Sequence, residues 1–314
     1  MKIVVADIGG THARFATAVL DGFRVEALTA PFVTEVAGHE TFEAAWRAYA
    51  AAAGPFPQVR AAAIAVAGKA GGDTVRLTNG PWSIRPASLA DSLGIDQVLV
   101  LNDFAAVAHA VAVLPPEQFA HLVGPDRPFP DQSVISVIGP GTGLGAAMVV
   151  RSAGGYAIVP TEGGHIAFAP LDPAEDALLA RLRGRYGRVS VERIVSASGL
   201  REMVEGGTED TRALWDAALS GTHQEAMERY LRCLGSVAGD LALAQGAAAL
   251  VLAGGHGRRI AGRLAASGFH DRFVAKGRFR ERLEALPIKL VAHPEPGLYG
   301  AAAAFARGGQ EGSS

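Results

Sequence analysis

Short apolar runs separated by glycine-rich turns dominate the first half of the chain. Residues 2–6 form a run rich in β-branched side chains, which predicts a buried strand, and residues 15–20 predict the strand that returns. Gly9 and Gly10 turn the chain between them, because glycine adopts positive φ without a Cβ clash. We therefore expect a hairpin whose turn leaves backbone N–H groups unpaired, and such groups can face an anion such as phosphate.

The same pattern recurs in the second half of the chain. Residues 133–138 predict a strand, residues 139–145 a turn with a glycine at every second position, and residues 146–151 another strand. Each half thus contains a strand, a turn with the pair Gly-Thr, and a second strand. This recurrence predicts two related lobes that face one another.

The rest of the chain alternates between predicted helices and strands. The spacing of Phe42, Trp46 and Tyr49 predicts a helix over residues 41–53 whose aromatic side chains lie in the core. Further strands are expected at residues 59–67, 97–101, 248–253 and 288–292. Further helices are expected at residues 88–93, 104–114, 175–186, 191–194, 200–204, 211–219, 224–245 and 298–307.

A double proline marks the predicted domain boundary. Pro115 and Pro116 end the helix before them, because proline cannot continue a helix. At 314 residues the chain also exceeds the size at which a single core keeps growing. We expect a small α/β domain made of residues 1–113 and 297–314, and a large α/β domain made of residues 114–296.

Composition and charge narrow the class of protein. Hydrophobic residues make up 49% and charged residues 19%, as in a globular protein with an ample core. The 29 basic and 31 acidic residues show no basic stripe, so we expect no nucleic-acid partner. Cys233 is the single cysteine, which excludes an internal disulfide and fits a reducing compartment.

Nothing in the sequence predicts a membrane partner. The apolar run before Asp7 is too brief for a signal peptide. Residues 133–150 are uncharged, but the glycines and Pro140 within them argue against a spanning helix. We expect a cytoplasmic protein.

Two turns carry candidate phosphate chemistry. Asp7 precedes the first turn, and its carboxylate is a ligand that Mg²⁺ prefers, often through water; an ordinary hairpin with an Asp in its turn is the alternative. The turn at residues 139–145 is neither a dinucleotide fingerprint, because a strand follows it, nor a P-loop, because Gly-Lys-Ser/Thr is absent. Its small residues would let the main chain approach a polyphosphate, unless it is a flexible surface loop.

Polar residues elsewhere have both a local and a chemical interpretation. Asp103 lies between a predicted strand and a predicted helix, so it can be an N-cap, an acid–base group, or both. Glu192 lies in the first turn of a predicted helix, where a carboxylate suits the helix dipole. His165 follows Glu162 by three residues, a spacing found in some metal sites, but the only cysteine lies in an unrelated helix, which argues against zinc.

Several motifs resemble those of a known superfamily. Asp7-Ile8-Gly9-Gly10-Thr11, the turn at residues 141–145 and Ala253-Gly254-Gly255 resemble the nucleotide-binding elements of sugar kinases, actin and heat-shock ATPases. Within that superfamily, Leu101-Asn102-Asp103-Phe104, Glu162-Gly163-Gly164-His165 and Ser190-Val191-Glu192-Arg193 resemble the bacterial ATP-dependent glucokinases. The resemblance spans residues 2–307 with the motifs in order. It implies a two-lobed actin-like ATPase (ribonuclease H-like) α/β fold, with mixed sheets flanked by helices and a cleft between lobes.

The resemblance also implies roles for individual residues. Asp103 matches the general base that takes the proton of the sugar 6-hydroxyl, and Asp7 matches the acid that holds Mg²⁺, through water. The residues that match sugar-binding positions are Asn79, Asn102, Asp103, Glu162, His165 and Glu192. The residues that match nucleotide-binding positions are Asp7, Gly9, Gly10, Thr11, Gly141, Thr142, Gly143, Gly254 and Gly255.

The implied activity is transfer of the γ-phosphoryl group of Mg·ATP to the 6-hydroxyl of glucose by a homodimeric enzyme. Alternatives are a kinase for mannose, fructose or an amino sugar, a kinase that uses polyphosphate, and a sugar-responsive regulator. A regulator of the related kind would need a DNA-binding helix pair before the first strand, for which we expect no room. His12 and Pro140 depart from the family pattern beside the two phosphate turns, which puts the nucleotide affinity in question.

Overall fold

The computed structural model describes residues 1–54, 59–68, 73–77, 80–204 and 210–308. The chain forms two compact units. The first comprises Met1–Leu114 and His293–Ser314, and the second comprises Pro115–Ala292. Each unit contains one six-stranded sheet, so each is described by itself.

The sheet of the first unit is mixed, with the strand order β3-β2-β1-β5-β8 and with β4 paired to β2. β1 pairs antiparallel with β2 and parallel with β5, and β5 pairs parallel with β8. The strands are β1 (Lys2–Ile8), β2 (His12–Asp21), β3 (Arg24–Leu28), β4 (Phe32–Glu35), β5 (Ala61–Val66) and β8 (Gln97–Asn102). β6 (Val75–Arg76) and β7 (Ser83–Ile84) form a separate two-stranded sheet.

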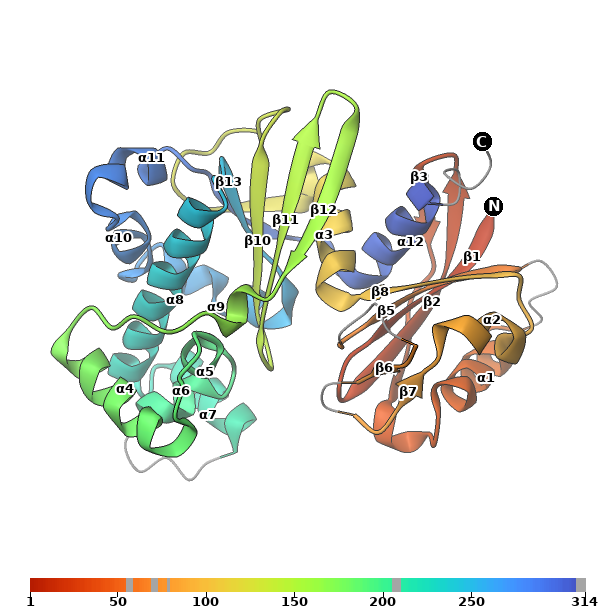
Figure 1. Ribbon diagram of the computed structural model, residues 1–314, viewed down its shortest axis with the longest axis horizontal. Coiled ribbons are helices and arrows are strands. Elements are labelled where there is room, and N and C mark those ends of the chain that lie inside the picture. The colour runs from red at the N-terminus through yellow and green to blue at the C-terminus, as the bar shows by residue number, and fades with distance from the viewer. Residues whose placement is uncertain (55–58, 69–72, 78–79, 205–209, 309–314) are drawn as a thin grey trace. The chain divides into compact units, whose positions relative to one another are not determined.

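Helices cover both faces of this sheet (Figure 1). On one face α1 (Phe42–Ala53) and α2 (Pro86–Leu93) bury an aromatic core that includes Phe15, Trp46 and Tyr49. On the other face α3 (Asp103–Val113) and α12 (Pro296–Gly308) pack on each other and on small side chains of β1 and β5. Because glycine and alanine line this face, the α12 and α3 backbones approach closely. A Cβ at Gly300 would meet the Ala106 carbonyl.

The second unit repeats this architecture. Its sheet has the order β12-β11-β10-β13-β14-β9, in which β10 pairs antiparallel with β11 and parallel with β13. The strands are β9 (Phe119–Val123), β10 (Val134–Pro140), β11 (Leu144–Ser152), β12 (Gly155–Thr161), β13 (Ala249–Leu252) and β14 (Ile288–Val291). The order and direction of β12, β11, β10, β13 and β14 match those of β3, β2, β1, β5 and β8, which confirms the internal repeat predicted from the two Gly-Thr turns.

The second unit is richer in helices than the first. α8 (Gln224–Ala244) is the longest helix described and contributes side chains to the main core of this unit. The other helices are α4 (Pro173–Tyr186), α5 (Glu192–Val195), α6 (Gly199–Met203), α7 (Thr211–Ser220), α9 (Gly254–Leu264), α10 (Phe269–Val274) and α11 (Arg280–Glu284). The short 3₁₀ turns of the chain are η1 (Val36–Gly38), η2 (Pro116–Gln118), η3 (Gly163–His165) and η4 (Gly277–Phe279).

The structure corrects several local predictions. Gly9 turns the chain without a positive φ, and its N–H is not unpaired, because it donates to the His12 carbonyl at 3.0 Å. The second turn is tighter than predicted, because Pro140 and Leu144 already pair across the hairpin. Asn102 rather than Asp103 is the N-cap of α3.

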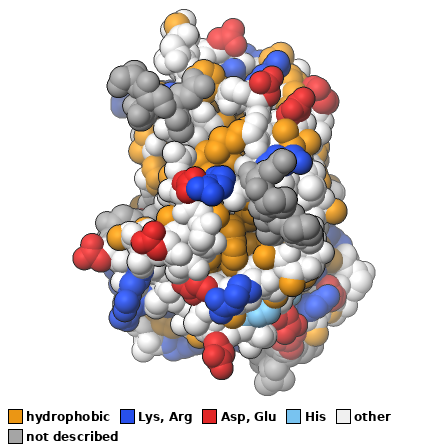
Figure 2. Space-filling view, turned by 90° about the vertical axis from the view of Figure 1, so that its right-hand side faces the viewer, with side chains coloured by type: hydrophobic (Ala, Val, Ile, Leu, Met, Phe, Trp, Pro, Cys, Tyr) orange, Lys and Arg blue, Asp and Glu red, His pale blue; other side chains and the backbone are white. Residues whose placement is uncertain are grey.

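The charged surface shows no segregation by sign on the face that Figure 2 draws, where basic and acidic side chains are interspersed. Within the described part of the chain, none of the helices combines the length and the apolar character that a bilayer span requires.

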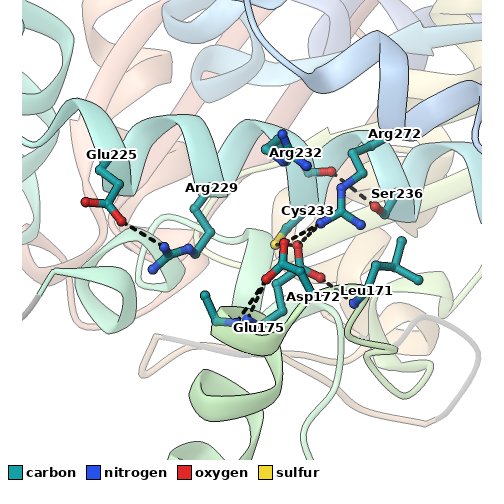
Figure 3. A network of polar contacts seen from close by, with 10 residues as sticks. Leu171, Asp172, Glu175, Glu225, Arg229, Arg232, Cys233, Ser236 and Arg272 are labelled. Atoms are coloured by element: carbon teal, nitrogen blue, oxygen red, sulfur yellow. Dashed lines mark hydrogen bonds and ion pairs between the residues drawn. The ribbon is translucent and has the colours of Figure 1, made fainter.

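A buried ion pair joins α4 to α10 in the second unit, beside the Cys233 thiol of α8 (Figure 3). The Arg272 guanidinium donates to the carboxylates of Glu175 and Asp172, and only the Asp172 carboxylate is partly exposed. Glu175 also accepts from the Leu171 N–H at 2.7 Å and lies 3.7 Å from the Cys233 thiol. Burial, with the Glu175 charge, raises the pKa of Cys233, so this cysteine stays a protonated core thiol.

Removing Arg272 should therefore destabilise the second unit. Arg272→Met leaves the Glu175 carboxylate buried without its cation, which costs about 3–5 kcal/mol of unfolding free energy. Urea unfolding measures this loss. Arg280→Met removes an exposed pair with Glu284 and should change the unfolding free energy by less than about 0.5 kcal/mol. Equal effects of the two substitutions would contradict a stabilising role for the buried Arg272–Glu175 pair.

Candidate functional site

In the first unit the candidate residues lie at the carboxyl edge of the parallel strands. Asp7 is the penultimate residue of β1, and Asn102 is the last residue of β8. β5 lies between the two strands, with Ala65 level with Asp7 and Val66 level with Asn102. In open α/β sheets this edge is where ligands bind, because the loops that follow the strands lie there.

Asn102 and Asp103 are held at this edge by hydrogen bonds. The Asn102 Oδ1 atom accepts from the N–H groups of Phe104 and Ala105 at 2.9 and 3.0 Å, and its Nδ2 atom donates to the Gly68 carbonyl at 3.2 Å. One oxygen of Asp103 accepts from the Phe104 N–H at 2.9 Å. The cap thus fixes the start of α3, and Asp103, its first residue, is only partly buried.

Asp7 lies in an ionic environment that the sequence motifs did not indicate. Arg14 is directly opposite Asp7 in the hairpin, and its guanidinium lies 3.7 Å from the Glu295 carboxylate. Burial raises the pKa of Asp7 to about 6, while Arg14 lowers it and Glu295 raises it. Gly297 faces the same carboxylate, because a Cβ there would lie 2.5 Å from Asp7 Oδ2. A cation beside Asp7 would favour its charged form, so this carboxylate fits a Mg²⁺ ligand.

The first predicted phosphate turn follows Asp7. Gly9, Gly10 and Thr11 join β1 to β2, and Thr11 is exposed. A Cβ at Gly80 would lie 3.5 Å from the Gly10 carbonyl, so the segment after Asn79 approaches the turn. Asn79 itself, predicted to lie near the sugar, falls outside the described residues.

The second predicted phosphate turn lies at the equivalent place in the second unit. Gly141, Thr142 and Gly143 join β10 to β11, and the Gly141 N–H donates to the Gly143 carbonyl at 2.8 Å. Gly254 begins α9 one residue beyond β13, with φ +84°, and a Cβ there would lie 4.0 Å from the Pro140 carbonyl. β10 and β13 thus place the turn and the Gly254-Gly255 pair close together.

The three predicted sugar residues of the second unit come from two segments that are bonded to each other. Glu162 precedes η3 and His165 is its last residue. The Glu162 carboxylate lies 3.9 Å from His165 Nε2, and both side chains are mainly exposed. Glu192 begins α5 and is partly buried. The Val191 N–H donates to the Ile166 carbonyl at 2.9 Å, which brings these segments side by side.

The orientation of the Glu192 side chain could not be predicted from the sequence. Its Oε2 atom accepts from the Leu144 N–H at 3.0 Å, although the residues are far apart in the chain. Arg14 could have been found from the hairpin register, because it pairs with Asp7. No sequence signal connects Glu192 with Leu144, or Gly297 with Asp7. Among the described residues, no three His, Cys, Asp or Glu side chains gather into a metal-binding cluster.

His256 lies in the first turn of α9, beside the Gly254-Gly255 pair. Its ring packs edge-on against Trp215, with 3.9 Å between the ring centroids. The buried Nε2 atom has no hydrogen-bond partner within the described ranges. Burial, helped by the charge of Arg259, lowers the pKa of His256 from 6.5 to about 4.

This buried histidine predicts acid sensitivity. Between pH 6.5 and 4, His256 is protonated in the unfolded state but neutral in the folded state. The free energy of unfolding is therefore highest above pH 6.5 and falls as the pH drops. His256→Asn should remove about 1.5 kcal/mol of the loss in unfolding free energy between pH 6.5 and 5. Chemical denaturation at both pH values measures it. His121→Asn, at an exposed histidine, should lose as much unfolding free energy between the two pH values as the wild type. An equal loss in all three proteins would refute the assignment of acid sensitivity to His256.

Comparison with known proteins places these features in one family. The family model described as Glucokinase matches residues 4–308. A glucokinase of Zymomonas mobilis is 48% identical, with 98% of each chain covered. A crystal structure of glucokinase from an Antarctic psychrotroph has a TM-score of 0.82 at 32% identity, covering 98% of this chain and 99% of that one.

A more distant structure shares the fold. A glucokinase of the ROK family from Streptomyces griseus, in complex with glucose and AMPPNP, has a TM-score of 0.65 at 21% identity, covering 98% of this chain and all of that one. The fold is therefore the two-lobed α/β kinase fold that the motifs predicted. With its motifs in order and its whole length matched, the chain belongs to the glucokinase family.

Proposed function

We propose that this protein phosphorylates D-glucose on its 6-hydroxyl with Mg·ATP, forming glucose 6-phosphate and ADP. The observation that carries the proposal is the match to a glucokinase at 48% identity over 98% of each chain. The relatives' names give the sugar. The AMPPNP that the Streptomyces griseus enzyme binds together with glucose supports a nucleoside triphosphate as donor.

We assign the general base to Asp103. Its position at the first residue of α3, next to the Asn102 cap, fixes the direction of a carboxylate that remains partly exposed. In the reaction one carboxylate oxygen of Asp103 would take the proton of the sugar 6-hydroxyl, while the oxygen of that hydroxyl attacks the γ-phosphorus of ATP and ADP leaves. A positioned base typically contributes roughly 10²–10⁴-fold to the rate.

We assign the sugar ring to side chains that accept or donate hydrogen bonds. Glu162, His165 and Glu192 would hydrogen-bond ring hydroxyls, together with Asn102 and Asn79. Carboxylates make such a site selective, because a substrate that lacks one hydroxyl leaves a buried acceptor unpaired. A mutual bond between the two segments that carry Glu162, His165 and Glu192 supports their action on one ligand.

The donor is assigned to the two turns of small residues. Gly9, Gly10 and Thr11 would contact phosphates from one hairpin, and Gly141, Thr142 and Gly143 from the other. The positions that we assign beside adenosine are Gly254 and Gly255. Asp7 would hold Mg²⁺ through water, and that ion, when bound, neutralises charge on the phosphate oxygens. Orientation by such contacts can supply about 7–11 kcal/mol, more than the base alone.

Two further properties are part of the proposal. We expect a homodimer, which the family resemblance implies, and a cytoplasmic location, which fits the single cysteine. The sequence alternatives, a kinase for mannose, fructose or an amino sugar, a polyphosphate-dependent kinase, and a regulator, differ from the proposal in substrate or in turnover. An assay of ADP release with and without glucose therefore tests the proposal directly.

Loss of the Asp103 carboxylate should remove most turnover. Asp103→Asn keeps the size of the side chain but cannot take up the hydroxyl proton, so kcat should fall by roughly 10²–10⁴-fold while glucose still binds. A coupled assay of ADP release and calorimetry with glucose measure the two effects. Asp91→Asn, at an exposed site on α2, should turn over normally. Near-normal turnover of Asp103→Asn would limit Asp103 to its role at the helix start.

Glucose should be the preferred sugar and ATP the preferred donor. Rates with glucose, mannose, fructose and glucosamine, and with ATP or polyphosphate, give kcat/KM for each pair. We expect the glucose and ATP pair to give the highest value. Another hexose that exceeds glucose more than about tenfold, a difference of about 1.4 kcal/mol, would overturn the substrate assignment.

A further inference from the structure

The carboxylate of Glu192 is bonded to the backbone of the second phosphate turn. Its Oε2 atom accepts from the N–H of Leu144, the first residue after the turn, at 3.0 Å. A charged acceptor forms one of the stronger hydrogen bonds available to a backbone N–H. The residue that we assign to the sugar therefore also contacts the element that we assign to phosphate.

A second backbone bond ties the same two segments together. The Ala197 N–H, just beyond α5, donates to the Gly141 carbonyl at 2.7 Å. The segment that contains both Glu192 and Ala197 is itself anchored in the core. Tyr230 Oη donates to the Val195 carbonyl and Trp215 Nε1 to the Ala197 carbonyl, each at 2.7 Å. Movement of the turn would thus be resisted by a fixed segment.

The other sugar-binding segment packs on the same residue of the turn. A Cβ at Gly164 would collide with the Leu144 carbonyl and would lie 3.2 Å from the Leu144 Cβ. Gly164 precedes His165, so the backbone that carries His165 lies against Leu144. Leu144 thus contacts both segments to which we assign sugar hydroxyls.

Gly143 shows how little room separates the turn from Glu192. A Cβ at Gly143 would overlap the Glu192 Oε2 atom and would lie 3.0 Å from Cδ. The overlap is with the far end of a side chain, so a methyl group there would be accommodated by displacing the carboxylate rather than by unfolding the segment. A Cβ at Gly141, in the same turn, would meet nothing within 4 Å among the described residues.

We propose that Glu192 is a positioning contact that couples glucose binding to the second phosphate turn. The inference rests on the proposed function, since it takes glucose as the ligand of Glu192. One carboxylate oxygen is committed to the Leu144 N–H, which aims the other at the sugar. The bare Gly143 permits this arrangement. Glucose bound to Glu192 restricts the movement of the turn, and the bond from the Leu144 N–H keeps Glu192 in position to bind glucose.

The test is glucose binding without nucleotide, measured by calorimetry. Gly143→Ala should weaken glucose binding roughly tenfold, because the displaced carboxylate loses the Leu144 bond and its aim. A control substitution away from the turn should leave the glucose dissociation constant unchanged. Gly154→Ala, in the β11–β12 turn with nothing near its Cβ among the described residues, controls for the substitution itself.

A double-mutant cycle separates positioning from a general disturbance of the turn. In a Glu192→Ala background there is no carboxylate to displace, so adding Gly143→Ala should cost no further glucose affinity. Equal losses in both backgrounds would overturn the proposal. Thermal unfolding of each variant checks that it folds.

A measurement on the wild-type chain keeps the proposal testable even if Gly143→Ala does not fold. Glucose alone should slow hydrogen exchange of the Leu144 amide, and exchange unaffected by bound glucose would overturn the proposal. Wild-type protein that binds no glucose would overturn the proposed function and this inference together. Wild-type binding with an unchanged dissociation constant in Gly143→Ala would overturn the inference alone.

Discussion

The close approach of backbone segments at Leu144 is the constraint on which the second unit's candidate site depends. The Leu144 side chain is 5% exposed and belongs to the main core, while its carbonyl faces Gly164 and its N–H bonds to Glu192. A Cβ at Gly164 would overlap the Leu144 carbonyl, and a Cβ at Gly143 would displace the Glu192 carboxylate, so this arrangement needs glycine at both positions. Small residues here serve proximity more than turn flexibility, since neither glycine has a positive φ.

The repeated sheet explains why candidate residues that are distant in sequence lie in equivalent places. In each unit an antiparallel hairpin is followed by a parallel neighbour, β5 beside β1 and β13 beside β10. A parallel strand brings its carboxyl end to the edge where the hairpin turns. The residues that follow these ends, such as Gly254, therefore lie near a phosphate turn without any local sequence relation to it.

Sequence patterns predicted the elements that have strong local signals. Both hairpins, α1 with its buried aromatic side chains, and the long α8 lie where periodicity placed them. The edge strands β3, β4 and β12 were missed, because their largely exposed residues give no apolar run. The cap of α3 was misplaced by one residue because Asn102 and Asp103 are equally good capping residues, and only the hydrogen bonds decide between them.

The candidate site was predictable as a set of motifs but not as a set of contacts, and the contacts determine how the set would work. A kinase must favour a sugar hydroxyl over water, and it can do so if the sugar helps to order the groups that hold the donor. The bond from the Leu144 N–H to Glu192 gives a physical route for such dependence, because linkage makes any effect of the turn on glucose affinity reciprocal. If one carboxylate serves both ligands, neither affinity can be understood from its own motif alone.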